Sequence, residues 1–170
     1  INSDLANGLG NLAQRSLSMI YKNCDGAIPE AGALSDEDQV LLTHAYEKLL
    51  PAIRGEANNM RFNRMLELIW RLVIDANGYI DAQAPWGLKK TDPERMKTVL
   101  YVLADVIRVL GIAVQSVTPE AGAKILNQLK IAEGERSFAN MSKDYALKSG
   151  TEIDQPEGVF PRLDTKEEAT

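Results

Sequence analysis

The chain has 170 residues, a formal net charge of -5, and 45% hydrophobic but only 6% aromatic residues. It is long enough for one well-buried domain, and its composition favours a helical bundle over a β-sandwich or barrel. No apolar run approaches the length of a membrane span, no secretory leader is recognisable, and a single cysteine, Cys24, fits a reducing compartment. We therefore expect a cytoplasmic protein without a membrane partner.

The negative charge is concentrated toward the C-terminal end of the chain. Residues 133–170 carry nine acidic and five basic side chains, whereas residues 1–132 carry fifteen and fourteen. The first 132 residues are therefore nearly neutral. Such a domain can bind RNA through a few well-aimed groups, but it cannot hold a long duplex by neutralising phosphates alone. Any RNA contact is expected to be small and directed at bases.

The first predicted helix spans about residues 3–21, with small or apolar side chains at intervals of three and four on one face. These residues are Leu5, Leu9, Leu12, Ser16 and Met19 or Ile20. Ser35, followed three residues later by Asp38, forms a capping-box pattern that begins a second helix. We expect Pro51 to kink this helix, whose core candidates are Val40, Leu41, Tyr46, Leu49, Leu50 and Ile53.

A third helix is predicted over residues 59–81, followed by a loop over residues 83–87. Its buried face is expected to hold Phe62, Leu66, Ile69, Val73, Ala76 and Ile80. Asp92-Pro93-Glu94 supplies a cap, a first helical position and a first-turn acid for a fourth helix. The predicted core residues of the fourth helix are Met96, Val99, Val102 or Leu103, Val106, Leu110 and Val114. Thr118-Pro119-Glu120 repeats the start signal for a short fifth helix that ends near Leu129.

Beyond Glu133 the helical periodicity fades, and the chain becomes polar and rich in turn residues. The sequence thus predicts an all-α fold, with an antiparallel bundle of about five helices over residues 1–132. Residues 133–170 are expected to form an irregular C-terminal extension that packs back on the bundle. Within it, Val159-Phe160-Pro161-Arg162 is a short extended apolar patch.

Three hydrogen-bonding side chains recur every fourth residue of the first helix: Asn7, Asn11 and Arg15. This spacing places them on nearly one line along the helix surface. Asn offers an acceptor and donors, and Arg offers a planar fork of donors, so the three could read the edge of an unpaired base. The alternative is an ordinary solvated face. Gly8 and Gly10 indicate a close approach to the helix backbone, by a ligand or by a packed helix.

Pro85 and Trp86 lie in the predicted loop, where an indole could stack on an unpaired base. The alternative is that Trp86 folds down as a lid on the bundle. Lys89 and Lys90 follow directly and are candidate phosphate contacts, as are Arg61 and Arg64, although solvated side chains are the default for all four.

Other classes of site find little support in the sequence. His44 is the only histidine and has no glutamate three residues before it, so the di-iron pattern of some helical bundles is absent. One cysteine and one histidine do not make a zinc site. No nucleophile with a matching base can be assembled. We expect neither a metal nor a catalytic residue in this chain.

Three segments that are far apart in the sequence form a recognisable combination. The first is Asn2-Ser3-Asp4-Leu5-Ala6-Asn7 with Leu9-Gly10-Asn11-Leu12 and Arg15, the second is Ala76-Asn77-Gly78-Tyr79-Ile80-Asp81 with Gln83-Ala84-Pro85-Trp86, and the third is Phe160-Pro161-Arg162-Leu163-Asp164. Together with their spacing, they resemble the helical anticodon-binding domain of bacterial methionyl-tRNA synthetases over nearly the whole chain. Related class I synthetases share helical anticodon domains, but the combination is typical of the methionine enzyme.

The resemblance implies a role for each matching residue in reading the anticodon CAU. Asn11 and Arg15 match the Asn and Arg that read the splayed anticodon bases, and Asn7 matches an assisting Asn one turn earlier. Trp86 matches the aromatic residue that stacks on the first anticodon base, and Pro85 shapes its loop. The implied partners are the anticodon loop of tRNA(Met) and a catalytic domain of the same polypeptide.

The implied parent enzyme is a class I methionine–tRNA ligase. Its HIGH and KMSKS motifs do not occur here, and the chain begins at Ile1 inside a helical pattern, so we expect a fragment without a catalytic site or cofactor of its own. ATP with Mg²⁺ would bind the missing catalytic domain, and the resemblance leaves open whether that domain also holds zinc. One alternative remains, a helical bundle that docks a protein partner without binding RNA.

Overall fold

The computed structural model describes the backbone of residues 5–160, and their side chains from Asn7 onward. In chain order the helical elements are η1 (Leu5–Gly10), α2 (Asn11–Asn23), α3 (Asp36–Thr43), η2 (His44–Lys48), α4 (Leu49–Asn58), α5 (Phe62–Gln83), α6 (Pro85–Thr91), α7 (Pro93–Val114), α8 (Pro119–Gln128) and the short turns η3 (Glu133–Glu135), η4 (Phe138–Met141) and η5 (Lys143–Tyr145). The only β-type pairing among residues 5–160 is an isolated bridge between Ala27 and Glu152. The predicted all-α bundle is confirmed.

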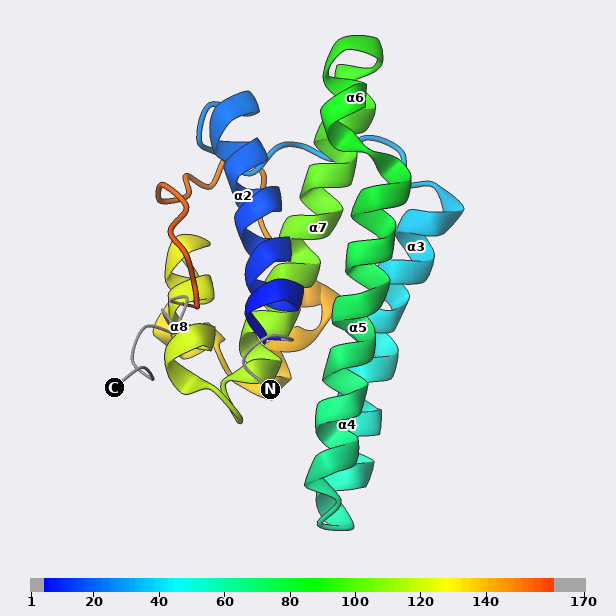
Figure 1. The fold of residues 1–170 in the computed structure, drawn as a ribbon, viewed down its shortest axis with the longest axis vertical. Helices are drawn as coiled ribbons and strands as arrows, with labels where there is room; N and C mark the ends of the chain where they lie inside the picture. Colours follow the sequence, from blue (N-terminus) through cyan, green and yellow to red (C-terminus); the bar gives the residue numbers. More distant parts are fainter. Residues whose placement is uncertain (1–4, 161–170) are drawn as a thin grey trace, which may run out of the picture.

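Helix α7 is the central helix of the bundle, with α2 and α5 side by side in front of it in Figure 1. Every residue of α7 from Val102 to Val114 is buried, including Asp105 and Arg108. All the core positions predicted for this helix are buried. The prediction of one buried face was too narrow, because the other sides of the helix are buried as well. A helix that is hydrophobic on every side must be surrounded by other elements.

Helix starts follow the predicted capping chemistry, with one exception. The Ser35 hydroxyl accepts from the Asp38 N–H at 3.3 Å, and the Asp38 carboxylate accepts from the Ser35 N–H at 2.9 Å. Asp92 caps α7 by accepting from the Arg95 N–H at 3.0 Å. Thr118 makes no such bond at the start of α8, although Pro119 and Glu120 occupy their predicted places.

The predicted second helix is divided into two α-helices by a π-helical turn. A π-helical turn, η2, separates α3 from α4 just before Pro51, whose ring cannot supply the N–H that a regular helix needs. The Leu49 N–H donates to the His44 carbonyl across this turn. The prediction that Val40 belongs to the core is wrong, because 71% of it is exposed.

The hairpin of α4 and α5 extends beyond the rest of the bundle, at the lower end of Figure 1. Ile69, Val73 and the later predicted core residues of α5 are buried, which confirms that face. Phe62 and Leu66 are exposed by 60% and 38%, so the prediction that they are buried is wrong. Their part of α5 lies at the hairpin tip, where little else covers it.

The first helical segment, η1 with α2, ends two residues later than predicted. Leu9, Leu12, Ser16 and Ile20 are buried as expected, whereas Met19 is only partly buried. The side chain of Leu5 lies outside the described residues.

Residues 133–160 are attached to the bundle by apolar and polar contacts. Met141, Leu147, Ile153 and Val159 are buried in the same core as the helices. The Leu147 N–H donates to the Asp105 carboxylate at 2.8 Å, and the Arg108 guanidinium donates to the Asn140 carbonyl at 2.5 Å. The apolar patch predicted over residues 159–162 is described only as far as Phe160, which is partly buried against the core; Pro161 and Arg162 lie outside the described residues.

Candidate nucleic-acid interface

The segment predicted as a loop is in fact a sharp turn followed by a short helix. Helix α5 ends at Gln83, and Ala84 adopts the left-handed conformation with φ of 43°. Pro85 then occupies the first position of α6, where a missing N–H costs nothing. Pro85 is buried and anchors the turn, whereas Trp86 beside it is 49% exposed. The indole is thus not buried as a core side chain, and about half of it remains open to solvent.

Arg15 and Trp86 are brought together although they are far apart in the sequence. The Arg15 guanidinium carbon lies over the indole, 5.2 Å from the ring centroid, which is within the range of a cation–π contact. One nitrogen of the same guanidinium, Nη2, donates to the Asp81 carboxylate at 2.9 Å. Among residues 7–160, the remaining N–H groups of the Arg15 fork have no hydrogen-bond partner, so they are free to donate to a ligand.

Asn7 and Asn11 are both exposed on the helical segment that carries Arg15. Asn7 lies in the π-helical turn η1, and four residues are slightly more than one turn of an α-helix and slightly less than one turn of a π-helix, so the two amides stay on similar sides. A Cβ added to Gly8 would lie 3.3 Å from Val73 and 3.5 Å from Trp70. The close approach predicted at Gly8 is thus made by α5, and Trp70 packs, partly buried, against the core.

Lys89 and Lys90 are exposed on α6, three and four residues after Trp86. Side chains at this spacing lie on one face of a helix. Both lysines therefore extend from the side of α6 that carries the indole. The structure brings these two predicted residues into the same region as Trp86.

Arg61 and Arg64 lie at the opposite end of α5 from Trp86. The 22 residues of α5 separate the two regions by about 33 Å at 1.5 Å per residue. Arg61 pairs with Glu56 at 2.9 Å, and Arg64 pairs with Glu67 at 2.7 Å. The structure does not bring these two arginines together with the other candidates, and their charges are already partly neutralised.

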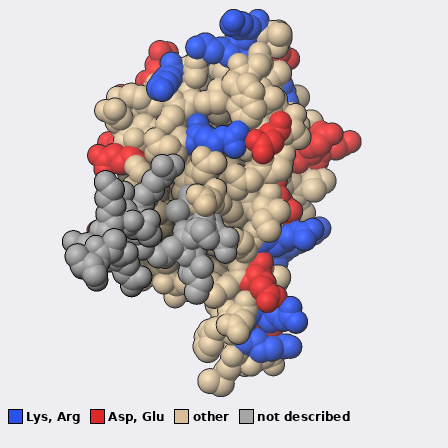
Figure 2. Space-filling view, viewed as in Figure 1, with Lys and Arg blue, Asp and Glu red and all other residues tan. Residues whose placement is uncertain are grey.

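Figure 2 shows the distribution of charge on the face formed by α2 and α5. Lys and Arg side chains gather at the upper end, where α6 lies, and at the tip of the α4–α5 hairpin. Between these ends, basic groups alternate with acidic ones, including a basic and an acidic group side by side near the middle of the face. This face therefore has no continuous basic track for a long duplex.

Two further groups near the site had no role assigned from the sequence. Asp81 holds the Arg15 guanidinium, and the Asn77 amide donates to the Gly8 carbonyl at 3.3 Å and to the Val73 carbonyl at 3.0 Å. Asn77 thereby ties η1 to α5. Their spacing of four residues on one helix face, just before Trp86, was the signal that could have identified them.

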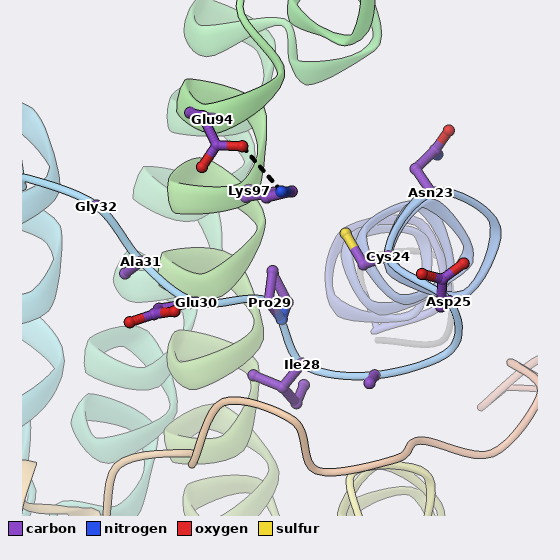
Figure 3. A pocket seen from close by; sticks show the side chains of 11 residues that line it. Asn23, Cys24, Asp25, Ile28, Pro29, Glu30, Ala31, Gly32, Glu94 and Lys97 are labelled. Atoms are coloured by element: carbon purple, nitrogen blue, oxygen red, sulfur yellow. Dashed lines mark hydrogen bonds and ion pairs between the residues drawn. The ribbon is translucent and has the colours of Figure 1, made fainter.

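A separate hollow of 410 Å³ lies between the end of α2 and the first turn of α7 (Figure 3). Cys24 faces Lys97 across it, and Lys97 is paired with Glu94 at 2.9 Å. Burial is the main cause that raises the pKa of the Cys24 thiol, so the thiol stays protonated and weakly nucleophilic at neutral pH. None of the predicted site residues lines this hollow.

Neither a cluster of potential metal ligands nor a membrane-spanning helix is found among the described residues. No group of three or more potential metal ligands occurs among those residues, and His44 instead meets Asp75 at 3.0 Å. Within residues 5–160, no helix combines the length and hydrophobicity of a membrane span.

Similar sequences are full-length ligases of which the chain spans about a third. The methionine–tRNA ligase of Rhizobium meliloti (strain 1021) is 47% identical over 162 residues, which cover 95% of this chain and 31% of the relative. The methionine–tRNA ligase of Mycobacterium tuberculosis (strain ATCC 25618 / H37Rv) is 45% identical over 166 residues, with the same shares of the two chains.

Solved structures agree with this likeness. The free-state crystal structure of M. tuberculosis methionyl-tRNA synthetase superimposes with a TM-score of 0.90 at 44% identity, covering 95% of this chain and 33% of that one. The same enzyme bound by methionyl-adenylate gives a TM-score of 0.90 at 45% identity. The family model for the anticodon binding domain of methionyl tRNA ligase matches residues 28–170. The chain belongs to this family of anticodon-binding domains.

Proposed function

We propose that this chain reads the CAU anticodon loop of tRNA(Met) as the RNA-binding part of a methionine–tRNA ligase. The observation that carries the proposal is the pairing of a half-exposed indole, Trp86, with the Arg15 guanidinium 5.2 Å from its ring centroid. Unpaired bases are recognised by stacking on aromatic rings and by hydrogen bonds to their exposed edges. The pair offers both kinds of contact at one place.

Each residue of the site has a distinct task in this proposal. Trp86 stacks on the first anticodon base through the indole face that Arg15 leaves open, and buried Pro85 fixes the turn beneath it. Arg15 donates to the edges of the splayed bases through the N–H groups that Asp81 does not use. Asn11 supplies both an acceptor and donors, and Asn7 assists from the preceding turn.

Contacts to the phosphates of the RNA are secondary in this proposal. Lys89 and Lys90 hold the backbone of the nucleotides that stack on Trp86. A contact of Arg61 or Arg64 would lie about 33 Å away, and so would involve the stem of the tRNA and not the anticodon loop.

The rest of the enzyme would perform the chemistry. The remaining two thirds of the polypeptide would bind ATP with Mg²⁺, activate methionine and transfer it to the tRNA in the cytoplasm. Binding of the correct anticodon to this domain favours charging at that distant site. We further propose that residues 159–163 pack against the catalytic domain, because Val159 anchors this segment in the core of the bundle and Phe160, only partly buried, is the first residue of the closing segment of the family resemblance. Deleting residues 159–163 should weaken the pairing of the two domains, and unchanged pairing would contradict this part.

A binding experiment with this chain tests the proposal. An RNA hairpin with CAU in its loop should bind, and hairpins with any of the three letters changed should bind more weakly. Arg15→Ala should weaken binding, whereas Arg71→Ala should not. Arg71 is a matched control, because it also lies on the bundle surface and also pairs with a carboxylate, that of Asp75 at 3.3 Å. Equal binding by all hairpins, or equal losses in both variants, would contradict sequence-specific reading.

The full-length enzyme provides the second test. Trp86→Ala and Arg15→Ala should leave the fold intact but strongly reduce charging of tRNA(Met). Unchanged charging by both variants would refute the reading of the anticodon through this site.

A further inference from the structure

A network of polar side chains lies behind the Trp86 site, at the junction of α3, α5 and α7. Its centre is Asp38, which is 0% exposed. The Asp38 carboxylate accepts from both terminal nitrogens of Arg95, at 2.5 and 2.8 Å, from the Tyr79 hydroxyl at 2.6 Å, and from the Ser35 N–H at 2.9 Å. A buried carboxylate with a two-pronged arginine and further donors is geometrically specific.

The network also closes the base of the segment that carries Trp86. Gln83 is the last residue of α5, and Arg95 lies in the first turn of α7. Arg95 Nη2 donates to the Gln83 side-chain oxygen at 2.8 Å, so the two ends of the α6 segment are joined by a side-chain bond. Through Asp38, both ends are attached to α3, which otherwise lies apart from the proposed RNA contacts.

Besides this network, Trp86 is held by the packing of α6 on α7 and by its contact with Arg15. The indole is half exposed, and the short helix α6 contributes only buried Pro85 and partly buried Leu88 to the core. The left-handed residue Ala84 is a single joint between α5 and α6. A rotation of the last turn of α5 against α7 would therefore move the indole away from Arg15.

Asp38 is charged when the network is formed. Burial acts to raise the pKa of Asp38, but the hydrogen bonds from Arg95, Tyr79 and Ser35 outweigh it and hold the pKa below its usual range. Replacing the carboxylate by an amide of the same shape removes the charge and the two-pronged acceptance while changing little of the packing.

We propose that Asp38 and Arg95 are positioning residues that hold Trp86 in the orientation needed to stack on an RNA base. This inference rests on the proposed function and deepens it, because neither residue touches the RNA. Loss of the network leaves only a fraction of molecules with a correctly directed indole, and the apparent affinity falls by that fraction.

The chain contains a matched control for this proposal. Asp105 is also 0% exposed, and it accepts from a tyrosine hydroxyl, an arginine and a backbone N–H, those of Tyr46, Arg108 and Leu147. This second network ties the C-terminal extension to α7 and has no bond to α6. Asp105→Asn therefore matches Asp38→Asn in chemistry and burial but not in location.

The test combines a binding measurement with a local probe of the indole. The chain has two tryptophans, so labelling with 5-fluorotryptophan gives two fluorine NMR signals, which Trp86→Ala assigns. We expect Asp38→Asn to raise the Kd for the CAU hairpin about tenfold and to shift the Trp86 signal toward its position in unfolded protein, with the Trp70 signal unchanged. Asp105→Asn should lower Tm to a similar extent and leave Kd and the Trp86 signal unchanged.

Two results would overturn the positioning role of Asp38 and Arg95. If both variants lose stability but retain the wild-type Kd and Trp86 signal, the Asp38 network only stabilises the bundle and the proposal is wrong. If Asp38→Asn does not fold, Gln83→Ala decides, since it removes only the bond at the base of α6; we expect a rise in Kd of about two- to tenfold, and no rise would overturn the proposal.

A failure of the proposed RNA-binding function would give a different result from a failure of the positioning role. In that case wild type and Trp86→Ala would bind the CAU hairpin alike. The fluorine signal of Trp86 in Asp38→Asn would still show whether the network holds the indole in place.

Discussion

The contact between Arg15 and Trp86 gives a quantitative prediction that does not depend on RNA. A double-mutant cycle with Arg15→Ala, Trp86→Ala and the double variant isolates the pair from their separate contacts, including the bond from Arg15 to Asp81. The guanidinium lies 5.2 Å from the ring centroid and both side chains are partly exposed. At exposed sites such pairs contribute about 0.5–1 kcal/mol, which is the coupling we expect in the free energy of unfolding.

The assay is urea unfolding of the four proteins, followed by circular dichroism. Because nearly half of Trp86 is already in water, Trp86→Ala should cost less than the ~3 kcal/mol of a buried tryptophan. A parallel cycle between Arg71 and Trp86 serves as the control and should be additive within about 0.3–0.5 kcal/mol. A coupling no larger than that of the control would show that the two groups do not interact in solution.

The same cycle extends to binding. Trp86→Ala should weaken binding of the CAU hairpin by about 1–3 kcal/mol, or about 5- to 150-fold in Kd, because the stacking of one base is removed. Trp86→Phe keeps an aromatic face and should weaken binding less. If alanine and phenylalanine have equal effects, stacking is not the contribution of this residue.

Three further predictions concern the bundle and its charges. Gly122→Ala should destabilise the chain by about 1–3 kcal/mol in urea unfolding, because the new Cβ would lie 2.8 Å from the Gly111 carbonyl oxygen. Gly78→Ala should instead stabilise α5 by about 1 kcal/mol, since nothing lies within 4 Å of its new Cβ. A Gly78→Ala variant that is less stable than wild type would contradict the second prediction. The pKa of Asp38 is lowered by folding, so its contribution is present above the unfolded pKa of about 3.9 and is lost as the pH falls through the folded value. The stability difference between wild type and Asp38→Asn should accordingly shrink on acidification, and a constant difference would argue against a charged Asp38. Replacing Lys89 and Lys90 by glutamine should reduce the slope of log Kd against log salt by about 0.7 for each phosphate that the lysines no longer neutralise, and an unchanged slope would remove both lysines from the interface.

The starts of the helices and the buried helix α7 could be predicted because their causes are local. A capping box such as Ser35 with Asp38 needs only four consecutive residues, and the apolar spacing of α7 identifies one buried face, although the burial of its other sides from Val102 onward depends on the neighbouring elements. Periodicity identifies the apolar face of a helix, but it does not tell whether another element covers that face at a given height. Phe62 and Val40 were therefore assigned to the core, although they lie where no neighbour covers them.

The predicted loop at Trp86 was wrong for a related reason. Proline and glycine around an indole are typical of loops, yet proline is also favoured at the first position of a helix, and here it begins α6. The turn itself depends on Ala84 in a left-handed conformation, which alanine rarely adopts and no sequence pattern signals. The core contacts of Pro85 and Leu88, together with the bond between Gln83 and Arg95, supply what the local sequence lacks.

The sequence predicted which residues belong to the candidate site better than it predicted how they are arranged. The spacing of Asn11 and Arg15 predicts a line of polar groups on one helix, but the contact with Trp86 joins residues 71 positions apart and exists only in the folded bundle. Asp81 and Asn77 had no assigned role, because a single carboxylate or amide on a helix surface is ordinary until its partner is known.

In the proposed function, the charges of the domain affect how it discriminates among RNAs. Arg15 already shares its charge with Asp81, Arg61 and Arg64 are paired with glutamates, and the chain carries a net charge of -5. Contacts to phosphate are the same for every sequence, whereas stacking and base-edge contacts require the right unpaired bases. In the proposed function, a chain with a net charge of -5 therefore gains little from the phosphates of an RNA that lacks the correct loop. This distribution of charge favours selectivity that comes from low affinity for other RNAs more than from high affinity for one RNA.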